Sequence, residues 1–321
     1  GGAVDSHWFN WNQNGTVIGS FRLGKPSNTG NPVELNGRNR SASEALVVNG
    51  PVTAYGSVVT VSTPLEVTGT GDIYLQGFAN NTAGIETYDT ITKSGGGDAT
   101  LTLKSNQRLN VRDNISATGT NTGKLNMVFW SDADATLNGG VSFFSDPAHS
   151  TNGGHIWIGG NGGANAYESK NWNGLIVGAG ASVGSYISNY NGADLQGTFN
   201  TSGGDFYVVG KTYVQTERNW DINATGGSIE VNAGSGDVTF VGNRVDFGGV
   251  YSSGESTTIN TTGTLTVRPF EESLGYDFNV SGSVIGSDWV GTPYTAASYV
   301  AANYINGTTN LTIKNIANLG G

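Results

Sequence analysis

The sequence predicts an all-β protein folded as a parallel β-helix, in which the chain winds in coils that stack along one axis. Three observations favour this fold class. Glycine contributes 51 of the 321 residues, whereas charged residues make up only 12% of the chain. Short runs of alternating apolar and polar residues recur along the sequence. Most of these runs begin about 20 to 30 residues apart, which is typical of a coil that stacks on itself.

Each recurring run is an expected β-strand with one buried face, because alternate side chains of a strand point to opposite sides. Glycine precedes each run and supplies a turn, and the Asp or Thr that often follows can bond the local backbone. The runs that begin at 154 and 204 stand two coils apart, whereas those at 227 and 236 belong to one coil. In order, the expected strands cover residues 71–75, 97–103, 123–129, 154–158, 204–208, 227–231, 236–240 and 263–267.

A second all-β architecture, a sandwich or propeller of antiparallel hairpins, competes with the β-helix. Hairpins favour Asn-Gly or Asp-Gly turns between two alternating runs. Asn-Gly pairs do occur in the chain, but few of them lie between two such runs. A β-helix explains more of the sequence, because it stacks like residues about 4.8 Å apart and accommodates glycine at its corners.

The composition argues against several classes of protein. The chain has no cysteine, so it holds neither a disulfide scaffold nor a cysteine-based zinc site. Its net charge is −10 and its 15 Lys and Arg residues are scattered singly, so we expect no nucleic-acid partner. No apolar run approaches the ~18–20 residues of a membrane span, so we expect no membrane insertion.

Two stretches interrupt the repeat, at about 165–194 and 270–307, and we expect loops or extra strands there that leave the rod. Each stretch is rich in large aromatic residues, whose rings can stack on the apolar faces of sugars. The same residues could instead pack in small cores beneath the loops. The candidate ligand-binding residues are Trp172, Tyr186 and Tyr190 in the first stretch and Trp289, Tyr294 and Tyr299 in the second.

A weak calcium site is suggested by Asp132, Asp134 and Asn138, where oxygen ligands at alternate positions precede a glycine turn. The match is incomplete, because residue 136 is threonine and no late glutamate follows. Asp and Asn also cap turns in which no metal is present, so a plain turn is the alternative. We expect no other cofactor.

Catalysis finds little support in the sequence. Polysaccharide lyases and hydrolases also use β-helices, and their chemistry needs paired carboxylates, or carboxylate-held Ca²⁺ beside a basic residue. The acidic residues of this chain mostly stand alone, and the adjacent Glu271 and Glu272 would point to opposite faces of a strand. We therefore expect no enzyme and keep a carbohydrate-active enzyme on a β-helix as the alternative.

Four segments follow one another in a distinctive order: GGDATLTLKS at 96–105, NISATG at 114–119, GKLNMVFWSDAD at 123–134 and NGGHIWIGG at 152–160. With LGKP at 23–26 and NLTI at 310–313, they resemble the repetitive body of filamentous-haemagglutinin-like and high-molecular-weight-type adhesins. These are giant exoproteins of bacterial two-partner secretion. The resemblance implies a right-handed parallel β-helix, export through an outer-membrane transporter partner, and a location at the bacterial cell surface or outside the cell.

The secretion domain of that family carries paired Asn-Pro motifs, whereas only Asn31-Pro32 occurs here. We therefore expect residues 1–321 to be one β-helix segment of a longer protein, outside its secretion domain. The expected role is structural and adhesive: a rod that presents binding loops to a host-cell or surface glycan or protein. Besides the enzyme, a passive spacer that binds no ligand stays open as an alternative.

Overall fold

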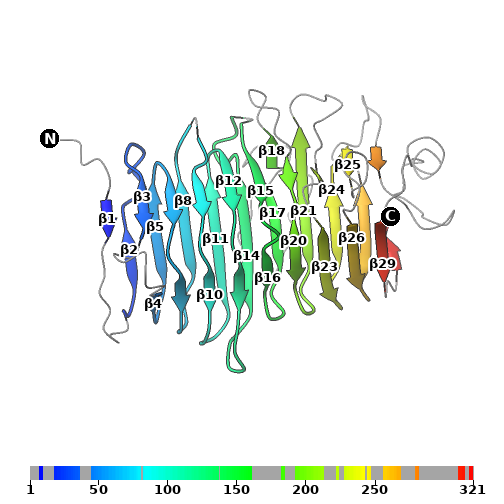
Figure 1. The fold of residues 1–321 in the computed structure, drawn as a ribbon, viewed down its shortest axis with the longest axis horizontal. Helices are drawn as coiled ribbons and strands as arrows, with labels where there is room; N and C mark the ends of the chain where they lie inside the picture. Colours follow the sequence, from blue (N-terminus) through cyan, green and yellow to red (C-terminus); the bar gives the residue numbers. More distant parts are fainter. Residues whose placement is uncertain are drawn as a thin grey trace.

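The protein is described by a computed structural model that covers residues 7–9, 18–36, 45–80, 82–136, 138–160, 182–184, 192–212, 222–223, 228–242, 244–246, 256–268, 279–281, 310–314 and 318–320. Every regular element in these residues is a β-strand, and none of them forms a helix. Figure 1 shows a rod that begins with the blue strands at the N-terminal end and finishes with the red strands. The predicted all-β parallel β-helix is confirmed, because all strand pairs along the rod are parallel and in order.

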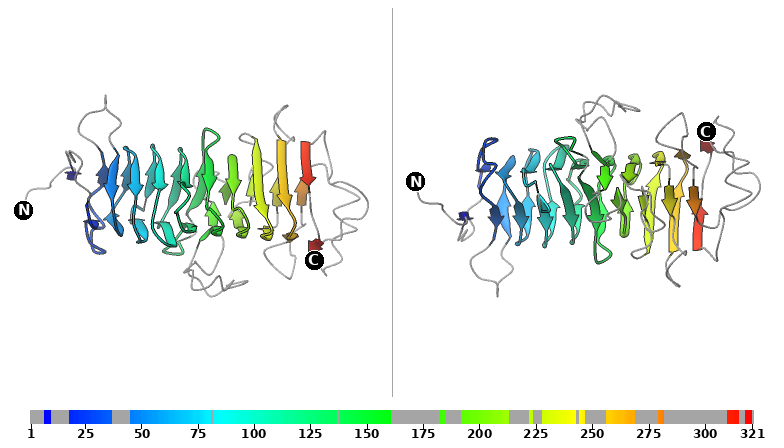
Figure 2. Two further views of the ribbon diagram at one scale, coloured as in Figure 1. Left: turned by 90° about the horizontal axis from the view of Figure 1, so that it is seen from below. Right: turned by 90° about the horizontal axis from the view of Figure 1, so that it is seen from above.

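Three parallel sheets, here called A, B and C, run the length of the rod, as both views in Figure 2 show. Sheet A contains β1 (His7–Phe9), β3 (Val33–Leu35), β6 (Val59–Val61), β9 (Ile85–Thr87), β12 (Arg108–Val111), β15 (Gly140–Phe143), β19 (Ala193–Asp194), β22 (Ile222–Asn223), β25 (Arg244–Asp246) and β28 (Asn279–Ser281). Sheet B contains β4 (Leu46–Val48), β7 (Leu65–Val67), β10 (Ile91–Lys93), β13 (Ile115–Ala117), β16 (Ala148–Ser150), β20 (Gly197–Asn200), β23 (Ile229–Gly234), β26 (Ser256–Thr261) and β29 (Asn310–Lys314). Sheet C contains β2 (Phe21–Leu23), β5 (Val52–Gly56), β8 (Ile73–Gly77), β11 (Ala99–Ser105), β14 (Leu125–Ser131), β17 (Ile156–Gly160), β21 (Phe206–Thr212), β24 (Val238–Val241), β27 (Thr264–Arg268) and β30 (Asn318–Gly320), and β18 (Ser182–Gly184) pairs with β21 beside this row.

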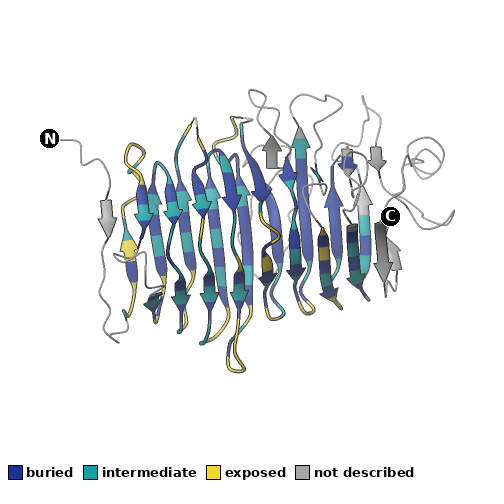
Figure 3. Cartoon of the chain, viewed as in Figure 1, coloured by how far each residue is buried: buried dark blue, intermediate teal, exposed yellow. Residues whose placement is uncertain are grey.

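Alternation of side chains decides which residues enter the rod. In β11, buried and half-buried residues alternate over all seven positions, and the same banding repeats along the rod in Figure 3. The buried residues of successive coils stand in register, as Leu65, Ile91 and Ile115 do in sheet B. The interior is therefore one continuous apolar core built from columns of stacked residues.

The interior gains aromatic rings along the rod. Val, Leu and Ile line most of the coils up to β13, whereas all the fully buried phenylalanines of the described residues lie from β14 onwards: Phe129, Phe143, Phe199, Phe206 and Phe240. Phe143 lies 5.1 Å from Phe129 and 5.0 Å from Phe199, and Phe199 lies 5.1 Å from Phe206, measured between ring centroids. His149 is buried among these rings, and its Nδ1 accepts a 3.3 Å hydrogen bond from the backbone N–H of Ile115.

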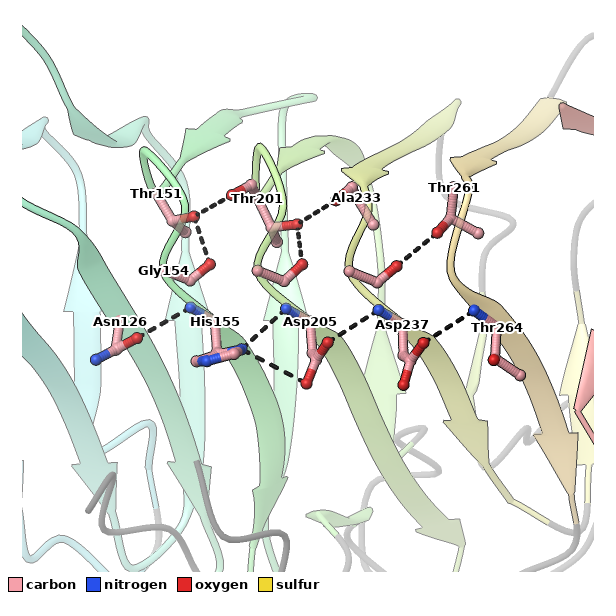
Figure 4. Close-up of polar contacts among 12 residues, drawn as sticks. Asn126, Thr151, Gly154, His155, Thr201, Asp205, Ala233, Asp237, Thr261 and Thr264 are labelled. Carbon is pink, nitrogen blue, oxygen red and sulfur yellow. Dashed lines mark hydrogen bonds and ion pairs between the residues drawn. The ribbon is translucent and has the colours of Figure 1, made fainter. Parts of the chain in front are cut away.

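Polar side chains at the start of the sheet C strands tie each coil to the next (Figure 4). Asn126 accepts a 3.0 Å hydrogen bond from the N–H of His155, and His155 Nδ1 accepts one of 2.9 Å from the N–H of Asp205. Asp205 and Asp237 continue the series with 2.9 Å bonds from Asp237 and Thr264. The sequence predicts that Asp after glycine bonds the local backbone, but these two carboxylates bond the next coil, because the stacking brings that backbone within reach.

A second row of polar side chains lines the corner between sheets B and C (Figure 4). It consists of the buried residues Thr151, Thr201 and Thr261, which we call the threonine ladder. The Thr151 hydroxyl lies 2.6 Å from the carbonyl of Gly154 in its own turn and 3.1 Å from that of Thr201 in the next coil. The Thr201 hydroxyl bonds its own turn in the same way, at the carbonyl of Gly204. These hydroxyls donate hydrogen bonds to buried carbonyls of the turns, where few regular strand partners are in reach.

Lys93 also donates hydrogen bonds to turn carbonyls at this corner, in the coil two before that of Thr151. It stands in register with Ala117 and is buried, and its Nζ donates to the carbonyls of Gly69 at 3.2 Å and Gly95 at 2.6 Å. Burial lowers the pKa of Lys93, and the nearby carboxylates of Asp98 and Asp72 oppose that shift. The buried amine of Lys93 and the buried hydroxyls of the threonine ladder thus have the same role, because each donates hydrogen bonds to backbone carbonyls at the turn.

Candidate functional site

The six aromatic residues predicted to bind a ligand all lie outside the described residues: Trp172, Tyr186, Tyr190, Trp289, Tyr294 and Tyr299. Within the two irregular stretches, the structure describes 182–184, 192–194 and 279–281. There β18 pairs with the end of β21, whereas β19 and β28 belong to sheet A. The expected two-coil separation of the runs at 154 and 204 is wrong, because β17 pairs directly with β21 in the next coil. The ligand-binding role of these six residues stays a prediction.

Asp132 and Asp134, the calcium candidates, accept hydrogen bonds within one turn. Asp132 is fully buried with a φ of 47°, and its Oδ1 accepts a 3.3 Å bond from the N–H of Asn138. Asp134 Oδ1 accepts bonds from the backbone N–H of Thr136 at 3.4 Å and from its hydroxyl at 3.0 Å. Within the described part of the chain, no three His, Cys, Asp or Glu side chains are grouped to hold a metal. The calcium hypothesis stays a prediction.

Sheet C carries aromatic residues on its outer surface, in two adjacent columns of in-register positions. One column consists of Thr53, Tyr74, Thr102, Val128, Trp157, Tyr207, Thr239 and Thr266. The other consists of Tyr55, Gln76, Lys104, Trp130 and Gly159. We call the surface formed by Arg22, Tyr55, Tyr74, Gln76, Phe78, Lys104 and Trp130 the aromatic face.

Tyr55 is the centre of the N-terminal part of the aromatic face. Its ring stacks on Phe78 with a centroid distance of 6.5 Å and an interplanar angle of 14°, and lies 5.8 Å from the ring of Tyr74. The guanidinium carbon of Arg22 lies 5.8 Å from the same ring. Tyr74 donates a 3.0 Å hydrogen bond to Gln76, and burial together with Tyr55 raises the pKa of Tyr74. The rings are therefore held in fixed orientations while they stay half-buried.

Lys104 and Trp130 extend the aromatic face along the rod. The Lys104 Nζ lies 4.0 Å from the centroid of the Trp130 ring, a cation–π contact between adjacent coils. Desolvation by the surrounding side chains lowers the pKa of Lys104. Trp130 is half-buried, and its Nε1 is buried with no hydrogen-bond partner among the residues that the structure describes. The face thus combines exposed ring area with a cation.

The same columns become buried beyond Trp130. Trp157 is only 3% exposed and lies 6.2 Å from Trp130, edge to face. Around it, outward-facing residues form a second apolar core, separate from the interior of the rod: Val128, Trp157, Tyr207, Val209 and Val241. Gly159 is required here, because a Cβ at this position would lie 2.5 Å from a ring atom of Trp157. This half of the outer surface serves packing.

Sequence reasoning placed the candidate sugar-binding aromatics in the irregular stretches and overlooked the outward-facing aromatics of the regular strands. A signal was present, because Tyr74 and Trp130 stand between inward-facing residues of alternating runs, where polar side chains are usual. What the runs do not reveal is that the coils align these rings into one surface.

The chain matches no family model, no curated protein and no solved structure. Within the described residues, no helix is long and apolar enough to span a membrane. The fold and the aromatic face therefore carry the functional argument.

Proposed function

We propose that the chain is a structural and adhesive segment of a large secreted bacterial surface protein, whose aromatic face binds a glycan. The observation that carries this proposal is the set of half-buried rings on the outer surface of sheet C: Tyr55 and Trp130 lie in one column, and Tyr74 lies in the adjacent column. The β-helix supplies the rod. Its location outside the cell and its export by an outer-membrane transporter belong to the same proposal and rest on the resemblance of the sequence.

The chemistry of the aromatic face suits a sugar chain. Aromatic rings offer apolar area on which pyranose rings pack, and half-burial fixes them at low entropic cost. Gln76 and Lys104 lie in the same column between the rings and provide polar contacts for hydroxyl groups. Adjacent coils stand about 4.8 Å apart, so an extended glycan lying along the rod meets one coil after another.

We favour binding over catalysis for this surface. Glycoside hydrolysis requires a pair of carboxylates beside the scissile bond. The residues that define the aromatic face include no Asp or Glu. Its cations, Arg22 and Lys104, are engaged with ring faces.

The test is binding of the purified chain to a neutral glycan array and to host cells, compared with the double variant Tyr55→Ala, Tyr74→Ala. Loss of two stacking rings is expected to lower the affinity for a neutral glycan by about tenfold. Thr92→Ala, on the outer surface of sheet B, is the control and should bind as the wild type does.

Three outcomes separate the candidates. Saturable binding that the double variant loses and Thr92→Ala retains supports the proposal. Binding that survives in the double variant overturns the placement on sheet C. If no glycan and no cell type is bound, the adhesive role is wrong and the passive spacer is the better account.

A further inference from the structure

A second cluster of side chains lies at the corner where sheet A ends, away from the aromatic face. Tyr88, Arg112 and Phe144 directly follow three in-register strands, so they stack in successive coils. The guanidinium carbon of Arg112 lies 5.3 Å from the ring centroid of Tyr88 and 4.5 Å from that of Phe144. Arg112 is thus held between two aromatic rings, and the Tyr88 side of this stack is open to solvent, since Tyr88 is 49% exposed.

Glu86 fixes the geometry of this cluster. Its Oε1 accepts a 3.1 Å hydrogen bond from Asn110 Nδ2, and its Oε2 accepts one of 3.0 Å from the Tyr88 hydroxyl. A carboxylate only accepts, so Asn110 must present its amino group to Glu86 and turn its carbonyl oxygen elsewhere. Within the described part of the chain, that buried oxygen has no hydrogen-bond partner.

The neighbouring coil leaves the Asn110 oxygen without a donor. Ser142 stands next to Asn110 in register, but its hydroxyl donates to Asp194 at 3.3 Å. Asn110 itself is 4% exposed. An unpaired buried carbonyl costs folding free energy, so the cluster carries an acceptor that its own neighbours do not satisfy.

In Arg112, it is a buried donor rather than an acceptor that lacks a hydrogen-bond partner among the described residues. Its Nε is buried without a hydrogen-bond partner, and its guanidinium forms no ion pair with any carboxylate among the described residues. The two rings hold its planar donor edge in place, which is the arrangement that suits bidentate recognition of a carboxylate or sulfate. The contacts of this guanidinium among the described residues are with Tyr88 and Phe144, so it has no carboxylate of the protein to displace.

We propose that Tyr88, Asn110 and Arg112 form a binding site for an anionic sugar. The carboxylate or sulfate of the ligand accepts hydrogen bonds from Arg112, a ligand hydroxyl donates to Asn110 Oδ1, and the sugar ring packs on Tyr88. Because the two unpaired atoms are buried in the free protein, binding involves rotation of the exposed Tyr88 side chain. This site lies on sheet A, so its test is independent of the proposed function of sheet C.

The experiment is an NMR titration of the intact ¹⁵N-labelled chain, in which the Nε–H signal of Arg112 is assigned by its loss in Arg112→Lys. The probes are trigalacturonate, a sulfated galactose trimer, the neutral galactose trimer and inorganic sulfate. We expect the Arg112 signal to shift with at least one anionic trimer and not with the neutral one. The two anionic trimers distinguish a carboxylate ligand from a sulfate ligand.

Variants separate the site from general charge effects. Arg112→Gln should weaken binding of the anionic trimer by about tenfold or more, because it removes charge-assisted hydrogen bonds. Arg108→Gln removes the same charge at the start of β12, the strand that Arg112 directly follows, and is the matched control, expected to bind within about twofold of the wild type. Tyr88→Leu should weaken binding as well, while circular dichroism checks that each variant is folded.

Several results would overturn the proposal. These are no shift of the Arg112 signal with either anionic trimer, equal weakening in Arg108→Gln and Arg112→Gln, or an equal response to inorganic sulfate and to the sulfated trimer. The last result would reduce the site to an ion-binding arginine.

Discussion

Two parts of the rod share one repeat but use its outward positions differently. We call the coils from β5 to β13 the N-terminal half and those from β14 to β24 the central half. From β5 to β13 the coils have a single core inside the rod, lined by aliphatic residues, and the outward rings of Tyr55 and Tyr74 are half-buried. From β14 to β24 there are two cores. The interior is rich in phenylalanine, and the outer surface of sheet C is itself buried around Trp157 and Tyr207.

The comparison shows that inward and outward positions of the strands have different roles in this solenoid. Inward positions are buried in every coil, so their identity affects stability throughout the rod. Outward positions are free to vary, and the same column carries Tyr74 where the surface is open and Trp157 where it is covered. We therefore assign the proposed glycan-binding role to sheet C from β5 to Trp130 in β14, and a packing role to sheet C beyond Trp130.

The sharpest test compares two residues of one column. Trp157→Ala should lower the free energy of unfolding by about 3–5 kcal/mol, because a buried indole is removed from the second core. Tyr74→Ala should cost only about 1 kcal/mol, since its ring is half-buried, and should act mainly on glycan binding. Urea denaturation of both variants measures the difference. Equal losses would show that the outer surface is not divided in this way.

Acid should destabilise the central half through His149. Burial among aromatic rings lowers its pKa from 6.5 to about 3, and a hydrogen bond from the N–H of Ile115 to Nδ1 fixes the acceptor. Between these two pH values, His149 is protonated in the unfolded chain and neutral in the folded chain. The stability contributed by the neutral ring is therefore fully present above pH ~6.5 and is lost as the pH falls, by about 1.4 kcal/mol per unit.

His149→Phe isolates this contribution, because phenylalanine already occupies the in-register position in the next coil, at Phe199. Unfolding free energies measured from pH 7 to pH 4 should fall less steeply in the variant than in the wild type. Parallel curves would mean that His149 is not the group that titrates.

The smallest of these effects concerns the threonine ladder of the central half. Thr201→Val keeps the shape of the side chain but removes the hydroxyl that bonds the carbonyl of Gly204 in its own turn. We expect a loss of about 1–2 kcal/mol in unfolding free energy, because a buried acceptor loses its donor. Thr258→Val, at a half-buried outward position of β26, is the control and should change stability by about 0.5 kcal/mol or less. A loss equal to the control's would rule out the ladder as a stabilising feature.

Much of the fold could be predicted from local patterns. The run at 97–103 alternates cleanly, and β11 (Ala99–Ser105) follows it with every second residue buried. The short strands of sheets A and B were harder to foresee, because three residues such as Ile91–Lys93 give too little alternation to stand out. The role of Lys93 was also hidden, since a buried lysine becomes acceptable only where turn carbonyls receive its protons.

Local sequence patterns suffice to predict the strand-rich character, the parallel coil architecture and the inward face of each strong run, because period-two alternation and glycine turns are local properties. Which residues meet across coils depends on how the coils stack. Tyr88 and Arg112 lie 24 positions apart in the chain, whereas Asn110 and its neighbour Ser142 lie 32 apart, yet each pair stands side by side. Turns of unequal length set this register, and turn length leaves no trace in the alternation of the strands. The aromatic face and the Arg112 cluster therefore appear only when the coils are stacked.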